Sequence, residues 1–435
     1  MVNLAQLTPD TTADLFAQLT QLRRHLHKHA EVTWKEFQTQ ATIKAFLLEH
    51  AQIPEENISV CATTGLVVNI YGPTPADTPT PNGLKCIAFR GDMDALAMTE
   101  RNPHLEYESV NVGAAHMCGH DGHVTSLVGF AILLQRVRHL LPPHTSVRLL
   151  FQPAEEGGFG AVKMIEGGCL DGVDEIYGYH NGPFPLGSVA VRGGPMMAHA
   201  AFFSITVSGP GGHGSAPHQT QDPVLAAGHI IVAVQSIMSR SVSAQESAVI
   251  SITQVHGGEA DNVIPSKVTL SGTIRDFSPE VFATIEARLR AIVEHTAAAY
   301  GTVGAVTIHD SYPVTVNAHA QASIVTDVVA AAYGPEKVSS LGLPVSGSED
   351  FSYYLQKIPG AFYFVGTKEH NYEPTAADVS NPCCGQKPQN RGLHSDTYDF
   401  NDDILPITAR LFLELAQHRL GCTLYSKADM ELISK

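Results

Sequence analysis

The chain has 435 residues, of which 44% are hydrophobic and 16% charged, and its formal net charge is -16. This composition is typical of a folded globular protein, and the length exceeds what one hydrophobic core usually supports, so we expect two domains. The acidic charge would repel nucleic acid and anionic membranes, and we exclude both as partners.

Signals in the chain also bear on where the protein resides. The first residues lack the basic and apolar segments of a secretory signal, and no apolar run approaches the roughly 20 residues that span a bilayer. Seven scattered cysteines suit a reducing compartment better than a disulfide framework. We therefore expect a cytoplasmic protein.

The first 190 residues alternate between helical and extended patterns. Leucines at three- and four-residue spacings predict a helix over residues 12–28. A second helix is expected over 121–141, with Asp121 as its N-cap. Short apolar runs predict strands at residues 65–72, 85–92, 146–153 and 174–181. Strands that alternate with helices favour an α/β sheet.

The pattern changes near residue 195, where a half-exposed strand runs into a glycine-rich turn. Two strand–helix units follow, and they predict a small α+β sandwich inserted into the first domain. The expected elements of the insertion are a helix at 222–240, strands near 248–255 and 267–274, and a helix from 279 to about 300.

Beyond residue 310 the α/β pattern resumes. The expected elements are a helix at 321–333, a strand at 361–366 and a closing helix at 402–420. We therefore divide the chain into a catalytic domain formed by residues 1–194 and 311–435 and an inserted domain formed by residues 195–310.

Residue types that bind metals or protons follow three of the predicted strands. They are Asp92 with Asp94, then Glu155 with Glu156, then His180. The ligand crevice of an open α/β sheet lies beyond the carboxyl ends of its strands, so we expect these side chains to converge there. A fourth motif, Cys118-Gly-His120, opens the helix between two of these strands and should reach the same edge.

The Cys118-Gly-His120 motif allows three interpretations by itself. An isolated pair of this kind is usually a buried cysteine beside a capping histidine. A cysteine nucleophile would need a base with suitable geometry, and a base only two residues away does not provide it. A metal site needs more ligands than two, and the neighbouring strand ends supply candidate carboxylates and imidazoles.

The two adjacent glutamates, Glu155 and Glu156, could have different roles in a metal site. Neighbouring residues of an extended chain point to opposite sides, so one carboxylate could face a metal while the other faces a water as general base. In isolation the pair would be a solvated turn, and His180 would be an ordinary core or turn residue. Asp92 and Asp94 could be capping or turn residues. Alternatively, one of them could orient a metal ligand without binding the metal itself. We place Asp92 among the catalytic residues.

A series of motifs between about residue 20 and residue 415 resembles one known family. In order they are AFRGDMDAL, HMCGHDGH, LLFQPAEEGG, GYHN, GPGGHGSAPH, DNVIP with GTIRDF, GSEDFS and LHSDTYDFNDDIL. The series resembles the di-metal amidohydrolases, which include aminoacylases, hippurate hydrolases and plant auxin-conjugate hydrolases, relatives of carboxypeptidase G. The resemblance implies an α/β, zinc-exopeptidase-like catalytic domain with an inserted α+β sandwich that serves as a dimerisation (lid) domain.

The resemblance also implies a metal site with two divalent metal ions per subunit. Cys118 matches the cysteine that bridges the two metals, and His120, Glu156, His180 and His394 match the remaining ligands. A thiolate with imidazoles and a carboxylate suits zinc, and manganese, cobalt and nickel are alternatives.

Further positions match the family's catalytic and substrate-binding residues. Glu155 matches the general base, and His213 matches a histidine that reaches the active site of the partner subunit and steadies the oxyanion. Asn262 and Arg275 match positions that hold the substrate's carboxylate.

These matches predict hydrolysis of N-acyl amino acids, as small-molecule substrates, to a carboxylic acid and a free amino acid by a homodimer or larger homo-oligomer. The alternatives are a metallo-dipeptidase or carboxypeptidase of the same superfamily, a non-catalytic metal-binding protein, which would lack the general base, and a cysteine hydrolase.

Two regions depart from the family pattern. Ala30 stands where the family usually has proline. The loop between Gly366 and His394 is longer than usual, which makes His370 a rival of His394 as a ligand. The same loop contains the adjacent Cys383 and Cys384, which we interpret as free thiols because no further ligand spacing is visible nearby.

Overall fold

The structure is a computed structural model that describes residues 7–73, 83–369 and 392–434. The chain forms two compact units. The first unit spans Met1–Met196, Val316–Leu343 and Tyr353–Lys435, and the second spans Met197–Thr315 and Pro344–Ser352. The second unit therefore takes a short additional piece, 344–352, from the stretch that the sequence pattern assigned to the returning catalytic domain.

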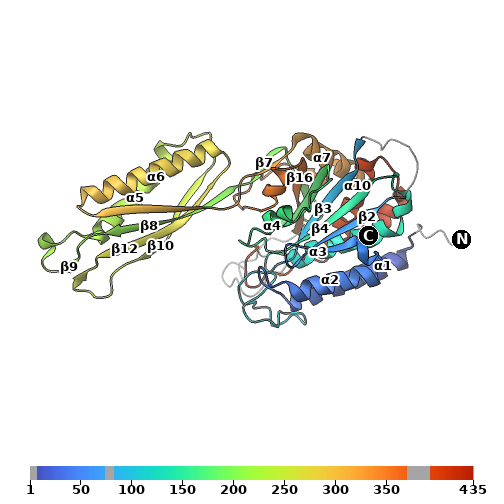
Figure 1. Cartoon of the computed structure of the whole chain (residues 1–435), viewed down its shortest axis with the longest axis horizontal. Helices are drawn as coiled ribbons and strands as arrows, with labels where there is room; N and C mark the ends of the chain where they lie inside the picture. The colour runs from blue at the N-terminus through green and yellow to red at the C-terminus, as the bar shows by residue number, and fades with distance from the viewer. Residues whose placement is uncertain (1–6, 74–82, 370–391, 435) are drawn as a thin grey trace. The chain divides into compact units, whose positions relative to one another are not determined.

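An eight-stranded sheet forms the centre of the first unit (Figure 1). Its strands, in spatial order, are β1 (Ile58–Cys61), β2 (Gly65–Tyr71), β4 (Ser146–Gln152), β3 (Cys86–Asp92), β5 (Glu175–Pro185), β16 (Gly360–Lys368), β6 (Val189–Ala190) and β15 (Val338–Ser339). Strands β4, β3, β5 and β16 run parallel to one another. Their carboxyl ends therefore lie at one edge of the sheet, where a ligand crevice is expected.

Helices pack on this sheet, and every residue of its central strand β3 is buried. The ring of Phe89 on β3 lies 4.9 Å from Phe130 on α3 (His120–Arg136) and 5.1 Å from Phe412 on α10 (Ile404–Leu420), measured between ring centroids. The other described helices of this unit are α1 (Pro9–Lys28), α2 (Phe37–Glu49), α4 (Gly160–Glu166), α7 (His319–Tyr333) and α11 (Lys427–Ile433). The short helix α8 (Ser352–Leu355) and the strands β7 (Gly194–Met197) and β14 (Thr315–Asn317) lie where the chain passes from one unit to the other.

The second unit is a two-layer α+β structure with an antiparallel sheet (Figure 1). Its strands, in spatial order, are β10 (Val249–His256), β12 (Lys267–Asp276), β8 (His199–Ser208) and β13 (Val303–Asp310). Helices α5 (Pro223–Arg240) and α6 (Pro279–Ala299) cover one face, and every second residue of β12 is buried against them. A separate two-stranded ribbon pairs β9 (Gly212–His213) with β11 (Val263–Ile264).

Helix α5 is the one helix within the described ranges that is long and apolar enough to cross a membrane. Its apolar character has another explanation in this fold. Ile230, Val234 and Ile237 of α5 are fully buried in the core of the second unit. The buried face of the helix thus accounts for part of its apolar character, although Val224, Leu225 and Val232 are exposed.

The structure confirms the predicted α/β class and each of the helices and strands expected above, with boundaries that differ by a few residues. Two details are wrong. Helix α3 begins at His120 with Gly119 as its N-cap, so Asp121 lies inside the first turn and does not cap it. Strand β5 continues to Pro185 because it pairs with β16, so His180 lies within the strand and not after its end.

Candidate metal centre

Five side chains predicted as metal ligands lie together in the first unit. The candidate ligand atoms of Cys118, His120 and His180 lie within 4.8 Å of one another, and so do those of Cys118, Glu156 and His394. The atoms of His120, Glu155 and Glu156 form a third group within the same limit. Each group shares at least one member with another, so all five ligand candidates and Glu155 belong to one cluster.

A glycine allows the loop that carries Cys118 to approach β5. Gly119 has a φ of 93°, a backbone conformation that L side chains rarely adopt. A Cβ atom at this position would lie 2.7 Å from Oδ1 of Asn181 on β5. The Cys118-Gly-His120 loop therefore needs glycine both for its conformation and for its close contact with the strand that carries His180.

Hydrogen bonds to backbone carbonyls orient two of the histidines. Nδ1 of His120 lies 2.9 Å from the carbonyl oxygen of Asp94, and Nδ1 of His180 lies 2.7 Å from that of Asn181. A carbonyl oxygen only accepts, so in both rings Nδ1 carries the proton and Nε2 presents its lone pair. Nε2 of His180 lies 3.3 Å from Sγ of Cys118.

Two buried atoms in the cluster have no hydrogen-bond partner, namely Nε2 of His120 and Oε1 of Glu156. They lie 3.9 Å apart, and the same Glu156 oxygen lies 3.5 Å from Nε2 of His394. Leaving such atoms buried and unsatisfied is costly, and a divalent cation would satisfy both. The donor set of thiol, imidazoles and carboxylate also suits such a cation, so these residues fit a metal site.

Electrostatics at the cluster argue against a free cysteine nucleophile. Burial raises the pKa of the Cys118 thiol well above its ordinary value, and the neighbouring Glu156 adds to this effect. Burial also raises the pKa of Glu156 to about 7 and lowers that of His394. A thiol with a raised pKa is a poor nucleophile, whereas binding a cation would favour its thiolate.

Asp92 lies behind the cluster and is firmly held. Its carboxylate accepts hydrogen bonds from Nη1 of Arg90 and Nδ1 of His123, both at 2.5 Å, and lies 3.7 Å from Nε2 of His120. Burial acts to raise the pKa of Asp92, but Arg90, His120 and His123 outweigh it and hold the pKa well below the usual range. Asp92 is thus a buried carboxylate that holds the ring of His123 by a hydrogen bond and lies beside Nε2 of His120 without bonding to it.

The glutamate pair is arranged differently from the sequence expectation. Glu155 and Glu156 occupy a turn after β4 and not an extended segment, and Ala154 before them has a φ of 55°. Both carboxylates approach the ring of His120. The inference that neighbouring side chains point to opposite sides is therefore wrong here, because the turn brings them to the same side.

The remaining predicted site residues lie in the second unit. His213 on β9 is exposed, and its Nδ1 accepts a hydrogen bond from the backbone N–H of Ser215 at 3.1 Å. The backbone N–H of Gly214 donates to the carbonyl oxygen of Asn262 at 2.8 Å, so His213 and Asn262 are neighbours. Arg275 lies elsewhere, on β12, with its guanidinium 5.5 Å from the ring centroid of Phe202.

Three residues discussed above, His370, Cys383 and Cys384, lie outside the described part of the chain.

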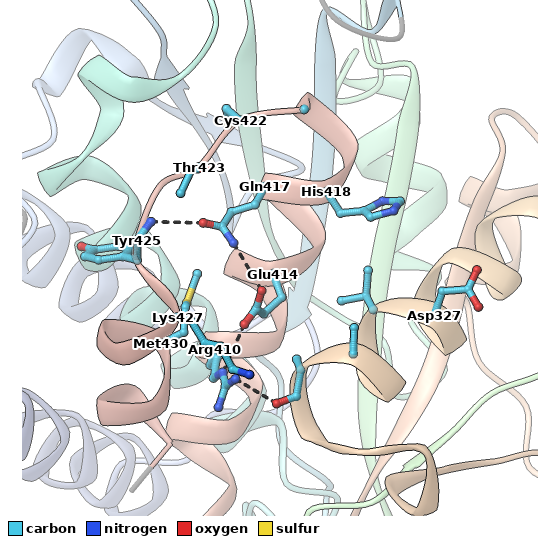
Figure 2. Close-up of a pocket in the computed structure, with 14 residues that line it drawn as sticks. Asp327, Arg410, Glu414, Gln417, His418, Cys422, Thr423, Tyr425, Lys427 and Met430 are labelled. Carbon is cyan, nitrogen blue, oxygen red and sulfur yellow. Dashed lines mark hydrogen bonds and ion pairs between the residues drawn. The ribbon is translucent and has the colours of Figure 1, made fainter.

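One cavity of the first unit lies away from the metal cluster. A cavity of about 680 Å3 lies between α7, α10 and the segment that leads into α11, where Arg410, Glu414 and Gln417 hydrogen-bond to one another (Figure 2). No residue of the metal cluster lines this cavity.

Comparisons with known proteins agree with this geometry. The model of peptidase family M20/M25/M40 matches residues 88–384. The chain is 37% identical over 373 residues to an N-acetyl-L-cysteine deacetylase of Bacillus subtilis (strain 168), covering 85% of this chain and 86% of the relative. It is 34% identical over 412 residues to an IAA-amino acid hydrolase of Arabidopsis thaliana, covering 94% and 87%.

A solved structure from Bacillus subtilis, described as a dinuclear metal binding peptidase from the M20 family, matches with a TM-score of 0.72 and 31% identity over 94% of this chain and 99% of that chain. Fold and site therefore define a metal-dependent amidohydrolase. The chain belongs to peptidase family M20/M25/M40, which confirms the resemblance inferred from the motifs.

Proposed function

We propose that the protein hydrolyses the amide bond of N-acyl amino acids and releases a carboxylic acid and a free amino acid. The observation that carries this proposal is a second glutamate, Glu155, which lies within 4.8 Å of the ligand atoms of His120 and Glu156 but is not needed as a ligand. The names of the relatives support the substrate class, since they describe a deacetylase of an N-acylated amino acid and a hydrolase of amino-acid conjugates.

In this proposal two divalent ions per subunit are held by Cys118, His120, Glu156, His180 and His394. Zinc or manganese is the favoured ion, and cobalt or nickel would fit the same donors. When bound, the ions would acidify a water molecule and polarise the scissile carbonyl group. Asp92 would contribute as a catalytic residue by placing a buried negative charge beside Nε2 of His120, the atom that would bind an ion.

The protein's own groups move the protons. Glu155 removes a proton from the attacking water as its oxygen bonds to the acyl carbon, and then delivers that proton to the amide nitrogen as the C–N bond breaks. His213 would steady the oxygen on which negative charge develops, and Asn262 and Arg275 would hold the carboxylate of the substrate. His213 is exposed on the second unit, and we propose that a homodimer presents it to the partner's site. We also propose that the protein is cytoplasmic.

A dipeptidase or carboxypeptidase activity is the second candidate. A carboxypeptidase of Saccharolobus solfataricus is 39% identical over 354 residues, covering 80% of this chain and 86% of the relative. The two classes of substrate differ on the acyl side of the scissile amide, where a dipeptide carries a free α-amino group and a simple N-acyl amino acid carries none.

One set of assays separates these functions. Metal-reconstituted protein is assayed on N-acetyl, N-benzoyl and indole-acetyl amino acids and on matched dipeptides. We expect kcat/KM to favour the N-acyl series by at least tenfold, and the reverse preference would support the peptidase. A chelator should abolish activity and added divalent ion restore it. Activity that survives chelation but is lost on cysteine alkylation would instead identify a cysteine hydrolase.

A further inference from the structure

Three consecutive backbone amides of the glutamate turn donate hydrogen bonds to two buried carboxylates. The N–H of Ala154 donates to Oε1 of Glu36 at 2.9 Å. The N–H of Glu155 donates to Oδ1 of Asp94 at 2.9 Å, and that of Glu156 to Oδ2 of Asp94 at 3.0 Å. We call Glu36 and Asp94 the carboxylate cradle.

Both members of the cradle are buried, with exposed fractions of 0% for Glu36 and 1% for Asp94. Further N–H and O–H groups hold them in place. The hydroxyl of Thr64 donates to Oε2 of Glu36 at 2.7 Å, and that of Thr33 donates to Oδ2 of Asp94 at 2.8 Å. A carboxylate with several fixed donors has little freedom to move, so the cradle can hold the turn that it binds.

Asp94 also contacts the metal cluster from its main chain. Its carbonyl oxygen is the acceptor for Nδ1 of His120 at 2.9 Å. One residue therefore fixes the ring of a metal-ligand candidate through its backbone and the turn of Glu155 and Glu156 through its side chain. Asp94 thus bonds both to the ring of His120 and to the turn that carries Glu155. The position of the proposed base relative to the proposed ligand therefore depends on this one residue.

We propose that Asp94, assisted by Glu36, is a positioning residue that places Glu155 for proton transfer. This inference rests on the proposed role of Glu155 as the general base. The conformation of the turn makes such support necessary, because Ala154 adopts a φ of 55° without being glycine and would lose this strained conformation if its neighbours did not impose it.

The donors around Asp94 show why a carboxylate is required. Its two oxygens accept from two backbone N–H groups and one hydroxyl, namely those of Glu155, Glu156 and Thr33. An asparagine has one acceptor oxygen and one NH2 donor, so in either orientation at least one backbone N–H of the turn would face a donor. Asp94→Asn should therefore release the turn while it preserves the volume of the side chain.

The structure offers a matched control at the opposite edge of the sheet. Oδ2 of Asp174 accepts the backbone N–H groups of two consecutive residues, Lys85 at 2.6 Å and Cys86 at 2.9 Å. Asp174→Asn makes the same chemical change before the start of β5, away from the metal cluster. Because one oxygen of Asp174 accepts both N–H groups, the asparagine oxygen can keep both hydrogen bonds, so this variant controls for the loss of charge alone.

The test compares Asp94→Asn and Asp174→Asn in the metal-reconstituted protein by four measurements. These are kcat, KM, metal content, and hydrogen–deuterium exchange of peptides that cover residues 153–158. For Asp94→Asn we expect kcat to fall by about 10² because the base is displaced. We also expect KM within threefold of wild type, unchanged metal content and at least tenfold faster exchange of the turn. Asp174→Asn should keep kcat within twofold.

Each result decides the inference. Unchanged exchange of the turn in Asp94→Asn, or a kcat within threefold of wild type, would overturn it, and so would an equal loss in Asp174→Asn. If Asp94→Asn does not fold, Glu36→Met tests the cradle, because it removes the acceptor of the N–H of Ala154 at similar side-chain length, with the same expected split between kcat and KM. A wild-type protein inactive on every substrate would defeat the proposed function instead, and the exchange data would still show whether the cradle holds the turn.

Discussion

The two units place their candidate functional residues in opposite environments. In the first unit Asp92 and His120 are completely buried, and hydrogen bonds to neighbouring groups fix their orientation. In the second unit His213 and Asn262 are exposed on a short two-stranded ribbon. Buried and hydrogen-bonded groups are preorganised for chemistry, whereas exposed groups acquire a role only when something is brought to them.

Under the proposed function, the first unit would hold the reacting groups and the second unit would supply contacts to a substrate or a second subunit. It also predicts different consequences of substitution. A change in the first unit should abolish the chemistry within one subunit. A change in the ribbon of the second unit should be correctable by a partner subunit that carries an intact ribbon.

The largest effect is expected for Glu155→Gln. Glutamine keeps the size of the side chain but cannot accept the proton of the attacking water. Since general bases contribute roughly 10² to 10⁴ in rate, kcat should fall by about 10³ or more. Metal content measured by atomic emission should stay at the wild-type value, because Glu155 is not assigned as a ligand.

Glu166→Gln is the control for this substitution, because Glu166 is an exposed glutamate of α4 that pairs with Lys163 at 2.7 Å. Its kcat should remain within twofold of wild type. A Glu155→Gln protein that retains near-normal kcat would show that another group is the base.

A smaller effect is expected for His213→Ala in the second unit. Loss of one group that stabilises an oxyanion lowers kcat by roughly 10² to 10³, while metal content should not change. Mixing this variant with Glu155→Gln tests whether the site is shared. After subunit exchange about half of the dimers would be mixed, and each would contain one intact site, so roughly a quarter of wild-type activity should return.

Subunit exchange must be shown independently, for example by fluorescence transfer between labelled subunits. If exchange occurs and no activity returns, the two residues act within the same subunit. That result would remove the distinction drawn above between a self-contained first unit and a second unit that acts on its partner.

The same contrast explains what the sequence could and could not reveal. The alternation of strands and helices predicted that the motifs containing Cys118, Glu156 and His180 lie close together, because parallel strands bring their carboxyl ends to one edge of a sheet, and the structure clusters them. The cradle residue Glu36 carries no such signal, since it lies in a loop far from the site in sequence and acts only through the N–H of Ala154. Tertiary contacts of this kind have no local pattern.

Local rules also failed where tertiary contacts outweigh them. Asp121 follows the rule for a helix cap, but its carboxylate binds Nδ1 of His27 at 2.8 Å, so it serves as a buried partner. The glutamate pair resembles an extended segment, but Asp94 and Glu36 hold it in a turn. In both cases the side chain or the backbone is bound by a partner distant in the sequence, which a local rule does not include.

The buried network behind α3 leads to a prediction about stability. His27 is fully buried between Asp121, at 2.8 Å, and Glu100, at 3.1 Å. Burial acts to lower its pKa, but the hydrogen bonds to Asp121 and Glu100 outweigh this and raise the pKa from 6.5 to about 9. A raised pKa in the folded state stabilises the protein fully below pH 6.5, and this stabilisation is lost as the pH rises through about 9.

We therefore expect the difference in unfolding free energy between wild type and His27→Gln to be largest near pH 6. It should shrink by roughly 2 to 3 kcal/mol by pH 10, measured by urea denaturation at fixed pH values. His199→Gln provides the comparison in the second unit. Its ring binds Asp276 at 2.6 Å and Asp310 at 2.7 Å, and although burial opposes them these contacts also raise its pKa.

His199 should show the same sign with a smaller amplitude, because Asp310 is 72% exposed and water screens its charge. A difference for His27→Gln that is constant across this pH range would mean that His27 acts as a neutral hydrogen-bonding group. Equal amplitudes at the two histidines would mean that the fully buried network around His27 is no stronger electrostatically than the partly exposed one around His199, and would weaken the contrast between the units.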